Sequence, residues 1–102
     1  LHPSVAPIKA GVFPLVKKDG MPEVARKLCT DLARRLPVFY DDSGSIGRRY
    51  RRQDEAGTPF GITVDGETLK DHAVTVRDRD TLVQERVGLD HVAAYLGERL
   101  ER

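Results

Sequence analysis

The sequence contains one cysteine, Cys29, three histidines and no tryptophan. A single thiol cannot form a disulfide within the chain, and one cysteine with three histidines does not give a zinc-ligand spacing. No apolar run approaches the ~20 residues that a membrane-spanning helix requires. These absences exclude a disulfide scaffold, and we expect a cytoplasmic protein with neither a bound metal nor a membrane association.

An excess of charge of either sign is also missing. The 17 Lys and Arg residues nearly balance 16 Asp and Glu residues, which leaves a formal net charge of +1. Binding to a polyanion would therefore depend on the local placement of a few side chains. Most of the basic residues are arginines, which suit bidentate contacts with phosphates and base edges. A GC-rich genome produces the same bias, so composition alone leaves both explanations open.

The first half of the chain predicts a strand, a helix and a second strand. Residues 6–15 are mostly apolar and contain prolines near both ends, which predicts a buried strand over this range, with the apolar Val16 directly after it. Apolar residues then recur at helical spacing from Pro22 to Leu36, and Pro37 predicts the end of the helix. Residues 38–40 predict a short strand, and residues 41–44 predict a loop.

The middle of the chain predicts a second helix with little apolar surface. Ser45 is the expected N-cap, and Gly57 is the expected stop after Ala56. The apolar face of this helix is thin and consists of Ile46, Tyr50 and Ala56.

The last part of the chain predicts an antiparallel meander and a closing helix. The three strands are expected at residues 59–64, 72–77 and 82–87, with short linkers at 65–66 and 78–80. A helix is expected from Asp90 onward. The resulting order, β-α-β-α-β-β-β-α, predicts a mixed sheet with helices on its faces, in a single domain that covers residues 1–102. Because Leu1 is not an initiator, we expect this domain to be a fragment of a longer chain.

The groups that enzymes use are sparse. The segment 44–47 places two glycines before a helix but lacks the Lys-Ser/Thr pair of a phosphate-binding loop. Cys29 lies on the apolar face of the first helix and is interpreted as a core thiol. His2, His72 and His91 are too scattered to form a catalytic arrangement. We therefore expect no catalytic residue, no metal site and no cofactor in this chain.

Arginines gather in two places. Four of them fall between Arg48 and Arg52, interrupted only by Tyr50, and Arg77 and Arg86 lie in the meander. Such groups can grip phosphates, stack on bases and bind the edges of splayed-out bases in single-stranded RNA. The alternative is a solvated helix held by ion pairs such as Arg51–Glu55, and spacing alone favours this alternative.

A family resemblance covers nearly the whole chain. Residues 44–60 read Gly-Ser-Ile-Gly-Arg-Arg-Tyr-Arg-Arg-Gln-Asp-Glu-Ala-Gly-Thr-Pro-Phe, and further matches follow at 62–65, 72–80 and 84–87. This pattern closely resembles the C-terminal anticodon-binding domain of glycyl-tRNA synthetases of the dimeric α2 type, which belong to class IIa.

The resemblance implies both a fold and a function. The fold is a three-layer α/β/α domain with a five-stranded mixed sheet in the order 2-1-3-4-5, strand 4 antiparallel, and three helices. The implied partner is the anticodon stem-loop of glycine tRNA, held so that a separate catalytic domain can attach glycine. ATP and magnesium would belong to that catalytic domain, the parent is expected to be a homodimer, and this fragment alone is not expected to be an enzyme.

The resemblance also indicates candidate RNA-binding residues. Arg48 and Thr63 match family positions that are expected to contact the anticodon cytosines. Glu67 follows Gly66, where family members often carry phenylalanine, and its carboxylate can accept from a cytosine amino group. Further candidates come from surface chemistry alone, and for each of them a structural ion pair is at least as well supported. They are Arg52, Glu55, Arg77 and Arg86.

Two other functions fit parts of the same pattern. A protein-interaction domain of this fold occurs in the accessory subunit of a mitochondrial DNA polymerase, and there Arg48 would not contact RNA. A small stand-alone enzyme is disfavoured because no catalytic arrangement is present. A deep pocket lined by carboxylates with shifted pKa values would favour it.

Overall fold

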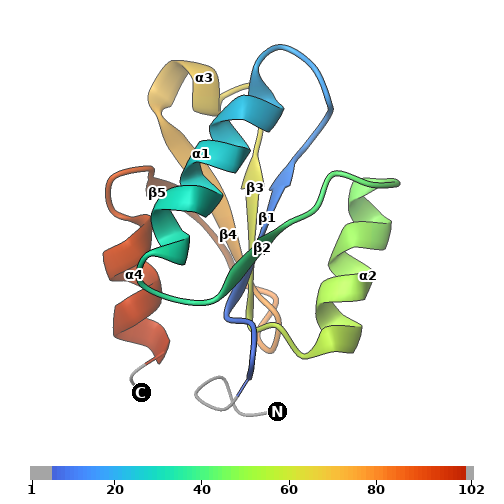
Figure 1. Cartoon of the computed structure of the whole chain (residues 1–102), viewed down its shortest axis with the longest axis vertical. Helices are drawn as coiled ribbons and strands as arrows, with labels where there is room; N and C mark the ends of the chain where they lie inside the picture. Colours follow the sequence, from blue (N-terminus) through green and yellow to red (C-terminus); the bar gives the residue numbers. More distant parts are fainter. Residues whose placement is uncertain (1–5, 101–102) are drawn as a thin grey trace.

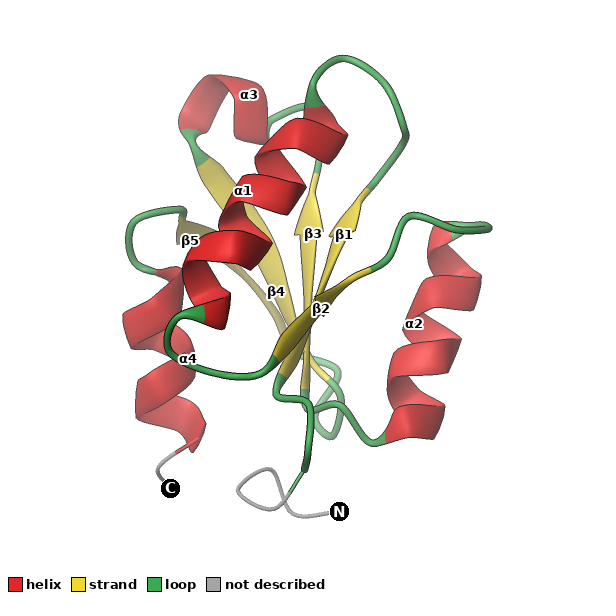
Figure 2. Cartoon of the chain, viewed as in Figure 1, coloured by secondary structure: helices red, strands yellow, loops and turns green. Residues whose placement is uncertain are grey.

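The chain forms a five-stranded sheet with helices on both faces (Figures 1 and 2). The computed structural model describes residues 6–100. Within that range the elements are β1 (Ala10–Pro14), α1 (Met21–Ala33), β2 (Val38–Tyr40), α2 (Ile46–Ala56), β3 (Phe60–Val64), α3 (Thr68–Asp71), β4 (Ala73–Asp78), β5 (Gln84–Gly88) and α4 (Val92–Leu100).

The strand order is β2-β1-β3-β4-β5. Strand β1 pairs in parallel with β2 and β3, whereas β4 pairs antiparallel with both β3 and β5. This confirms the expected order 2-1-3-4-5 with strand 4 antiparallel. The two parallel pairs arise because α1 and α2 return the chain to the same end of the sheet, as crossover connections do.

The helix count is four among the described residues, and not the expected three, because α3 joins β3 to β4. Asp65 Oδ1 accepts from the Thr68 backbone N–H and from its hydroxyl, both at 3.1 Å, and the Asp65 N–H donates to Thr68 Oγ1 at 3.0 Å. His72 ends the turn with a φ of 55°. A single helical turn has no apolar periodicity, so the sequence predicted only a tight turn at Asp65-Gly66.

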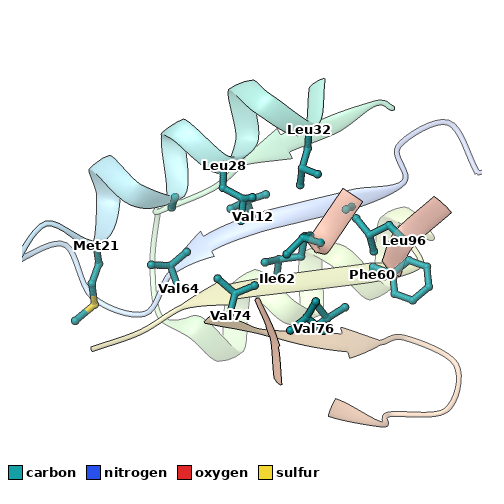
Figure 3. Close-up of a cluster of buried hydrophobic side chains, with 14 residues drawn as sticks. Val12, Met21, Leu28, Leu32, Phe60, Ile62, Val64, Val74, Val76 and Leu96 are labelled. Atoms are coloured by element: carbon teal, nitrogen blue, oxygen red, sulfur yellow. The ribbon is translucent and has the colours of Figure 1, made fainter. Parts of the chain in front are cut away.

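Alternate strand residues face two different layers. Val12, Ile62 and Val74 belong to the hydrophobic core on the face covered by α1 and α4, to which Leu28 and Leu96 contribute (Figure 3). The opposite face carries Phe13, Gly61 and Thr63 beneath α2, and the Phe13 and Tyr50 ring centroids are 5.5 Å apart.

The first strand and the first helix are shorter than predicted. Strand β1 ends at Pro14, and Leu15 and Val16 are exposed, because the chain leaves the sheet after the Leu15 N–H donates to Val64 O at 2.7 Å. Helix α1 ends at Ala33, although the Leu36 N–H still donates to Leu32 O at 3.0 Å. Local apolar character therefore predicted the elements but not their ends.

Replacement of Gly61 by alanine is expected to destabilise the domain by about 1–3 kcal/mol through overpacking. A Cβ atom at position 61 would contact the Gln53 side chain and lie 2.9 Å from Tyr50 Cε1. Gly97→Ala is the matched control, because its added Cβ would meet no side chain and no other element within 4 Å. Alanine there should stabilise α4 by about 0.5–1 kcal/mol. Urea unfolding measures both, and an unchanged midpoint for Gly61→Ala would contradict this packing.

Candidate nucleic-acid interface

Helix α2 begins and ends as its sequence predicts. The Ser45 hydroxyl accepts from the Arg48 backbone N–H at 3.2 Å, which satisfies one of the free donors of the first turn. Gly57 ends the helix with a φ of 74°, in the left-handed region that glycine adopts without a steric cost. The first turn contains no acidic residue, so the positive end of the helix dipole is not neutralised there.

The buried face of α2 differs from the predicted one. Arg49 is 3% exposed and Gln53 is fully buried, whereas Tyr50 is half-buried and Ala56 is exposed. Hydrogen bonds from Arg49 Nη1 and Nη2 and from Gln53 Nε2 to backbone carbonyls offset part of the cost of this burial, while Arg49 Nε and Gln53 Oε1 have no partner among residues 6–100. Of the apolar residues that were expected to form this face, Ile46 and Tyr50 are only partly buried and Ala56 is exposed.

Three backbone carbonyls accept hydrogen bonds from the buried face of α2. The Arg49 guanidinium donates through Nη1 to Pro14 O, and through Nη2 to Gly44 O at 3.2 Å. Gln53 Nε2 donates to Thr58 O at 3.1 Å. Arg49 thereby ties the end of β1 to the loop that precedes α2, and it fixes the rotation of the helix about its axis.

This rotation turns two arginines toward solvent. The guanidinium groups of Arg48 and Arg51 are exposed and form no hydrogen bond or ion pair with any residue between 6 and 100. Glu55 is also exposed, and the expected Arg51–Glu55 pair is not formed within the described residues. The helix is therefore not held together by pairs along its own outer face, which was the alternative explanation for its arginines.

Arg52 is engaged with the loop at residues 41–44. Its Nε and Nη2 atoms donate to Asp41 Oδ2 at 3.0 and 2.8 Å, and Nη2 also donates to Ser43 O at 2.7 Å. Partial burial raises the pKa of Asp41, but hydrogen bonds from the Ser43 backbone and from Arg52 outweigh that effect, so the pKa is lowered. Arg52 thus fixes the loop beside the first turn of α2.

Thr63 lies on the other flank of α2. It is 7% exposed, and its hydroxyl is hydrogen-bonded to the Tyr50 hydroxyl. The Arg77 guanidinium lies 4.7 Å from the centre of the Tyr50 ring and forms an ion pair with Asp54 at 3.4 Å. The structure therefore brings Thr63 together with Arg77, whereas Arg48 lies on the flank of α2 that faces residues 41–44.

Arg86 forms ion pairs with two carboxylates beside the end of β3. It donates to Asp65 Oδ2 at 2.8 Å, to Asp71 Oδ1 at 3.1 Å and to Thr75 Oγ1 at 3.2 Å. Hydrogen bonding to Asp65 raises the pKa of Arg86, and hydrogen bonding from Arg86 lowers the pKa of Asp71. Glu67 is exposed at the start of α3, and its carboxylate has no partner among residues 6–100.

Part of the α2-facing side of the sheet is left open by that helix. Thr75 pairs with Arg86, and Arg77 pairs with Gln84, so these four side chains project from the same face of β4 and β5. We call them the polar sheet surface. Sequence reasoning missed Thr75, Gln84 and the neighbouring Tyr50. The alternation of Val74 and Val76 with Thr75 and Arg77 was the signal that could have identified the exposed face.

No group of three or more His, Cys, Asp or Glu side chains capable of holding a metal occurs between residues 6 and 100. An open hollow of about 240 Å³ is lined by Val24, Lys27, Leu28, Asp31 and Leu89, on the side of the sheet away from α2.

The cysteine and histidines also fit structural positions. Cys29 is half-buried against the core, as predicted, and burial raises the pKa of its thiol. His72 ends α3, and His91 is exposed beside Asp90, while His2 lies outside the described residues. No helix within residues 6–100 is both long enough and apolar enough to cross a membrane.

The family model for the anticodon binding domain matches residues 9–99. The chain belongs to this family, as its sequence pattern indicated. A solved structure of the RNA-binding domain of threonyl-tRNA synthetase from Cryptosporidium parvum Iowa II has the same fold. It superposes with a TM-score of 0.81 at 24% identity, over 90% of this chain and 23% of that one.

Two curated relatives that match nearly the whole chain are both glycine--tRNA ligases. The chain is 60% identical to a glycine--tRNA ligase of Rhodopirellula baltica, over 99% of this chain and 19% of that protein. It is 55% identical to the glycine--tRNA ligase of Caldanaerobacter subterraneus subsp. tengcongensis, over 99% of this chain and 22% of the relative. The chain thus spans about a fifth of these relatives. They do not favour the protein-interaction alternative.

Removal of the charge at Asp65 should weaken the fold at neutral pH but not in acid. Partial burial raises the pKa of Asp65, but hydrogen bonds from Arg86 and Thr68 outweigh that effect, so the folded-state pKa lies below the unfolded one. Its ionised form therefore stabilises the fold above about pH 4, and this contribution is lost as the pH falls through the folded-state pKa.

Asp65→Asn should cost about 1 kcal/mol at pH 7, and the difference from the natural protein should shrink in acid and disappear once the pH is below the folded-state pKa of Asp65. Asp31→Asn, at an exposed position on α1, is the control for the change in net charge. Urea unfolding at several pH values measures the difference. A loss of stability that does not vary with pH would contradict the role of the charged pair.

Proposed function

We propose that this chain is the anticodon-binding domain of a glycine--tRNA ligase and holds the anticodon loop of glycine tRNA. The observation that carries the proposal is the orientation of α2. Its buried Arg49 turns the guanidinium groups of Arg48 and Arg51 outward, where they are free of protein partners among residues 6–100. The glycine--tRNA ligase relatives support the choice of tRNA.

Arg48 is the best-placed side chain for the RNA backbone. It lies in the first turn of α2, beside a loop that Arg52 and Asp41 hold in place. A helix N-terminus carries a partial positive charge, and a planar guanidinium binds two phosphate oxygens at once. Because Arg48 has no carboxylate to release within the described residues, a phosphate can bind it without breaking an ion pair.

The polar sheet surface is the proposed site for unstacked bases. Arg77 and Arg86 are held in fixed directions by Asp54 and by Asp65, and Thr75 and Gln84 add neutral donors and acceptors. Fixed donors and acceptors on an open face suit the hydrogen-bonding edges of splayed-out bases.

The remaining candidates contribute in different ways. Thr63 lies beneath the Tyr50 hydroxyl, so we assign Thr63 the positioning of Tyr50 rather than direct contact with a base. Glu67 is free to accept from a cytosine amino group. Glu55 is exposed and faces outward from α2, where it would meet only the periphery of an RNA loop.

The catalytic reaction belongs to the rest of the parent protein in this proposal. ATP, magnesium and glycine would bind to a separate catalytic domain, and the parent would act as a homodimer in the cytoplasm. This domain itself would need no cofactor. Its contribution is to present the correct tRNA, since interactions at the anticodon loop select the tRNA before the remote acceptor end reacts.

Arg48→Ala is expected to weaken binding of a glycine anticodon stem-loop by about 1–2 kcal/mol, or roughly five- to thirtyfold, by removing a charge-assisted contact. Stability should not change, because the Arg48 side chain has no partner within residues 6–100. Arg34→Ala is the matched control, since Arg34 is an exposed arginine at the end of α1. Fluorescence anisotropy at moderate salt measures the affinities, and equal values for Arg48→Ala and the natural chain would remove Arg48 from the interface.

A stem-loop in which the anticodon cytosines are replaced by uridines should bind less tightly, because the exocyclic amino donors are lost. We expect each replacement to cost about 1 kcal/mol. Affinity for both RNAs should fall with rising salt with a shallow slope, as expected when few phosphates are neutralised. Indifference to the cytosines, with the same salt dependence, would indicate unspecific RNA binding and would contradict the proposal.

A further inference from the structure

The turn between β4 and β5 is held rigidly by its own hydrogen bonds. Asp78 Oδ1 accepts from the backbone N–H groups of Asp80 and Thr81, at 2.8 and 3.1 Å. The Leu82 N–H donates to Asp78 O, and the Asp78 N–H donates to Val83 O, both at 2.9 Å. Its own hydrogen bonds therefore constrain this hairpin tip, residues 79–83, in the absence of any partner.

The rigid turn presents two apolar side chains to solvent. Leu82 is 61% exposed and Val83 is 52% exposed, which are the largest exposed fractions among the large hydrophobic side chains of residues 6–100. Leu82 also has a φ of 62°, in the left-handed region, which is unfavourable for leucine but is readily adopted by glycine and asparagine. A strained leucine that points into water contributes little to the isolated fold. Strain of this kind is concentrated at sites of function.

The hairpin tip lies at the end of the sheet where β1 and β3 begin. Asp78 is level with Phe60 and Ala10 in the strand register, and the Arg79 N–H donates to Pro59 O at 2.9 Å. Strand β1 begins and α4 ends at this same end of the domain (Figure 1). The chain spans about a fifth of its glycine--tRNA ligase relatives, so the rest of such a protein would join the domain here.

We propose that Leu82 and Val83 dock the domain onto an apolar surface of the remaining part of the same polypeptide. This inference rests on the proposed function only in that the domain belongs to a longer ligase chain. A rigid tip loses little conformational entropy on docking, and buried aliphatic side chains then supply the attraction. The first turn of α2 lies beside Pro14, at the opposite end of β1, so docking would leave Arg48 accessible to RNA.

The test compares one double variant in two contexts. Leu82→Asn with Val83→Thr removes the apolar side chains while asparagine keeps the left-handed turn. In the isolated 102-residue chain we expect an unchanged or higher melting temperature and unchanged affinity for the anticodon stem-loop. In the full-length ligase we expect a larger radius of gyration by small-angle X-ray scattering, and roughly tenfold faster trypsin cleavage between this domain and the rest.

Leu69→Gln is the matched control, because Leu69 is an exposed leucine on α3, beyond the other end of β3. Full-length protein with this change should scatter and be cleaved like the natural enzyme. Equal scattering and cleavage for the double variant and the natural enzyme would overturn the proposal. A loss of stem-loop affinity in the double variant would also overturn it, since the tip would then be an RNA contact. Failure of the natural chain to bind the stem-loop would contradict only the proposed function.

Discussion

The bonds from the buried Arg49 guanidinium to Pro14 O and Gly44 O are the constraint on which the arrangement of this domain depends. A guanidinium is costly to bury, and here backbone carbonyls, not a carboxylate, accept its hydrogen bonds. Because these carbonyls end β1 and precede α2, one side chain sets both the position of the loop and the rotation of the helix. Gly61 completes the fit, since it leaves room for the Gln53 side chain beneath α2.

The rest of the interface follows from that rotation. Successive residues of α2 point in directions about 100° apart, so burial of Arg49 leaves Arg48 and Arg51 in solvent. It also turns Arg52 toward Asp41 and Tyr50 toward Thr63. The two flanks of α2 thereby differ: one carries Arg48, which has no partner among residues 6–100, at a capped helix start, and the other continues into the polar sheet surface. A near-neutral chain can present positive charge locally in this way.

Much of the fold was predictable from the sequence, because the relevant signals are local. Ser45 and Gly57 predicted the ends of α2. The order of the apolar segments and the lengths of their linkers predicted the crossovers and the meander. Burial of Arg49 and Gln53 was not predictable, because it depends on carbonyls from Pro14 and Thr58 that only the folded chain brings near. The same reason applies to the ion pairs of Arg52, Arg77 and Arg86, whose partners lie 11 to 23 positions away. The candidate Thr63 was visible as a polar residue in a strand, but its place beneath Tyr50 was not.

The central claim is that RNA meets the α2 side of the sheet, at the first turn of the helix and across β4 and β5. The most direct measurement is a backbone amide NMR titration of the chain with a glycine anticodon stem-loop. The account predicts the largest shift changes at residues 44–52, 75–77 and 84–86, with α1 nearly unaffected. Shift changes that gather instead around Leu28, Asp31 and Leu89, on the opposite side of the sheet, would contradict it.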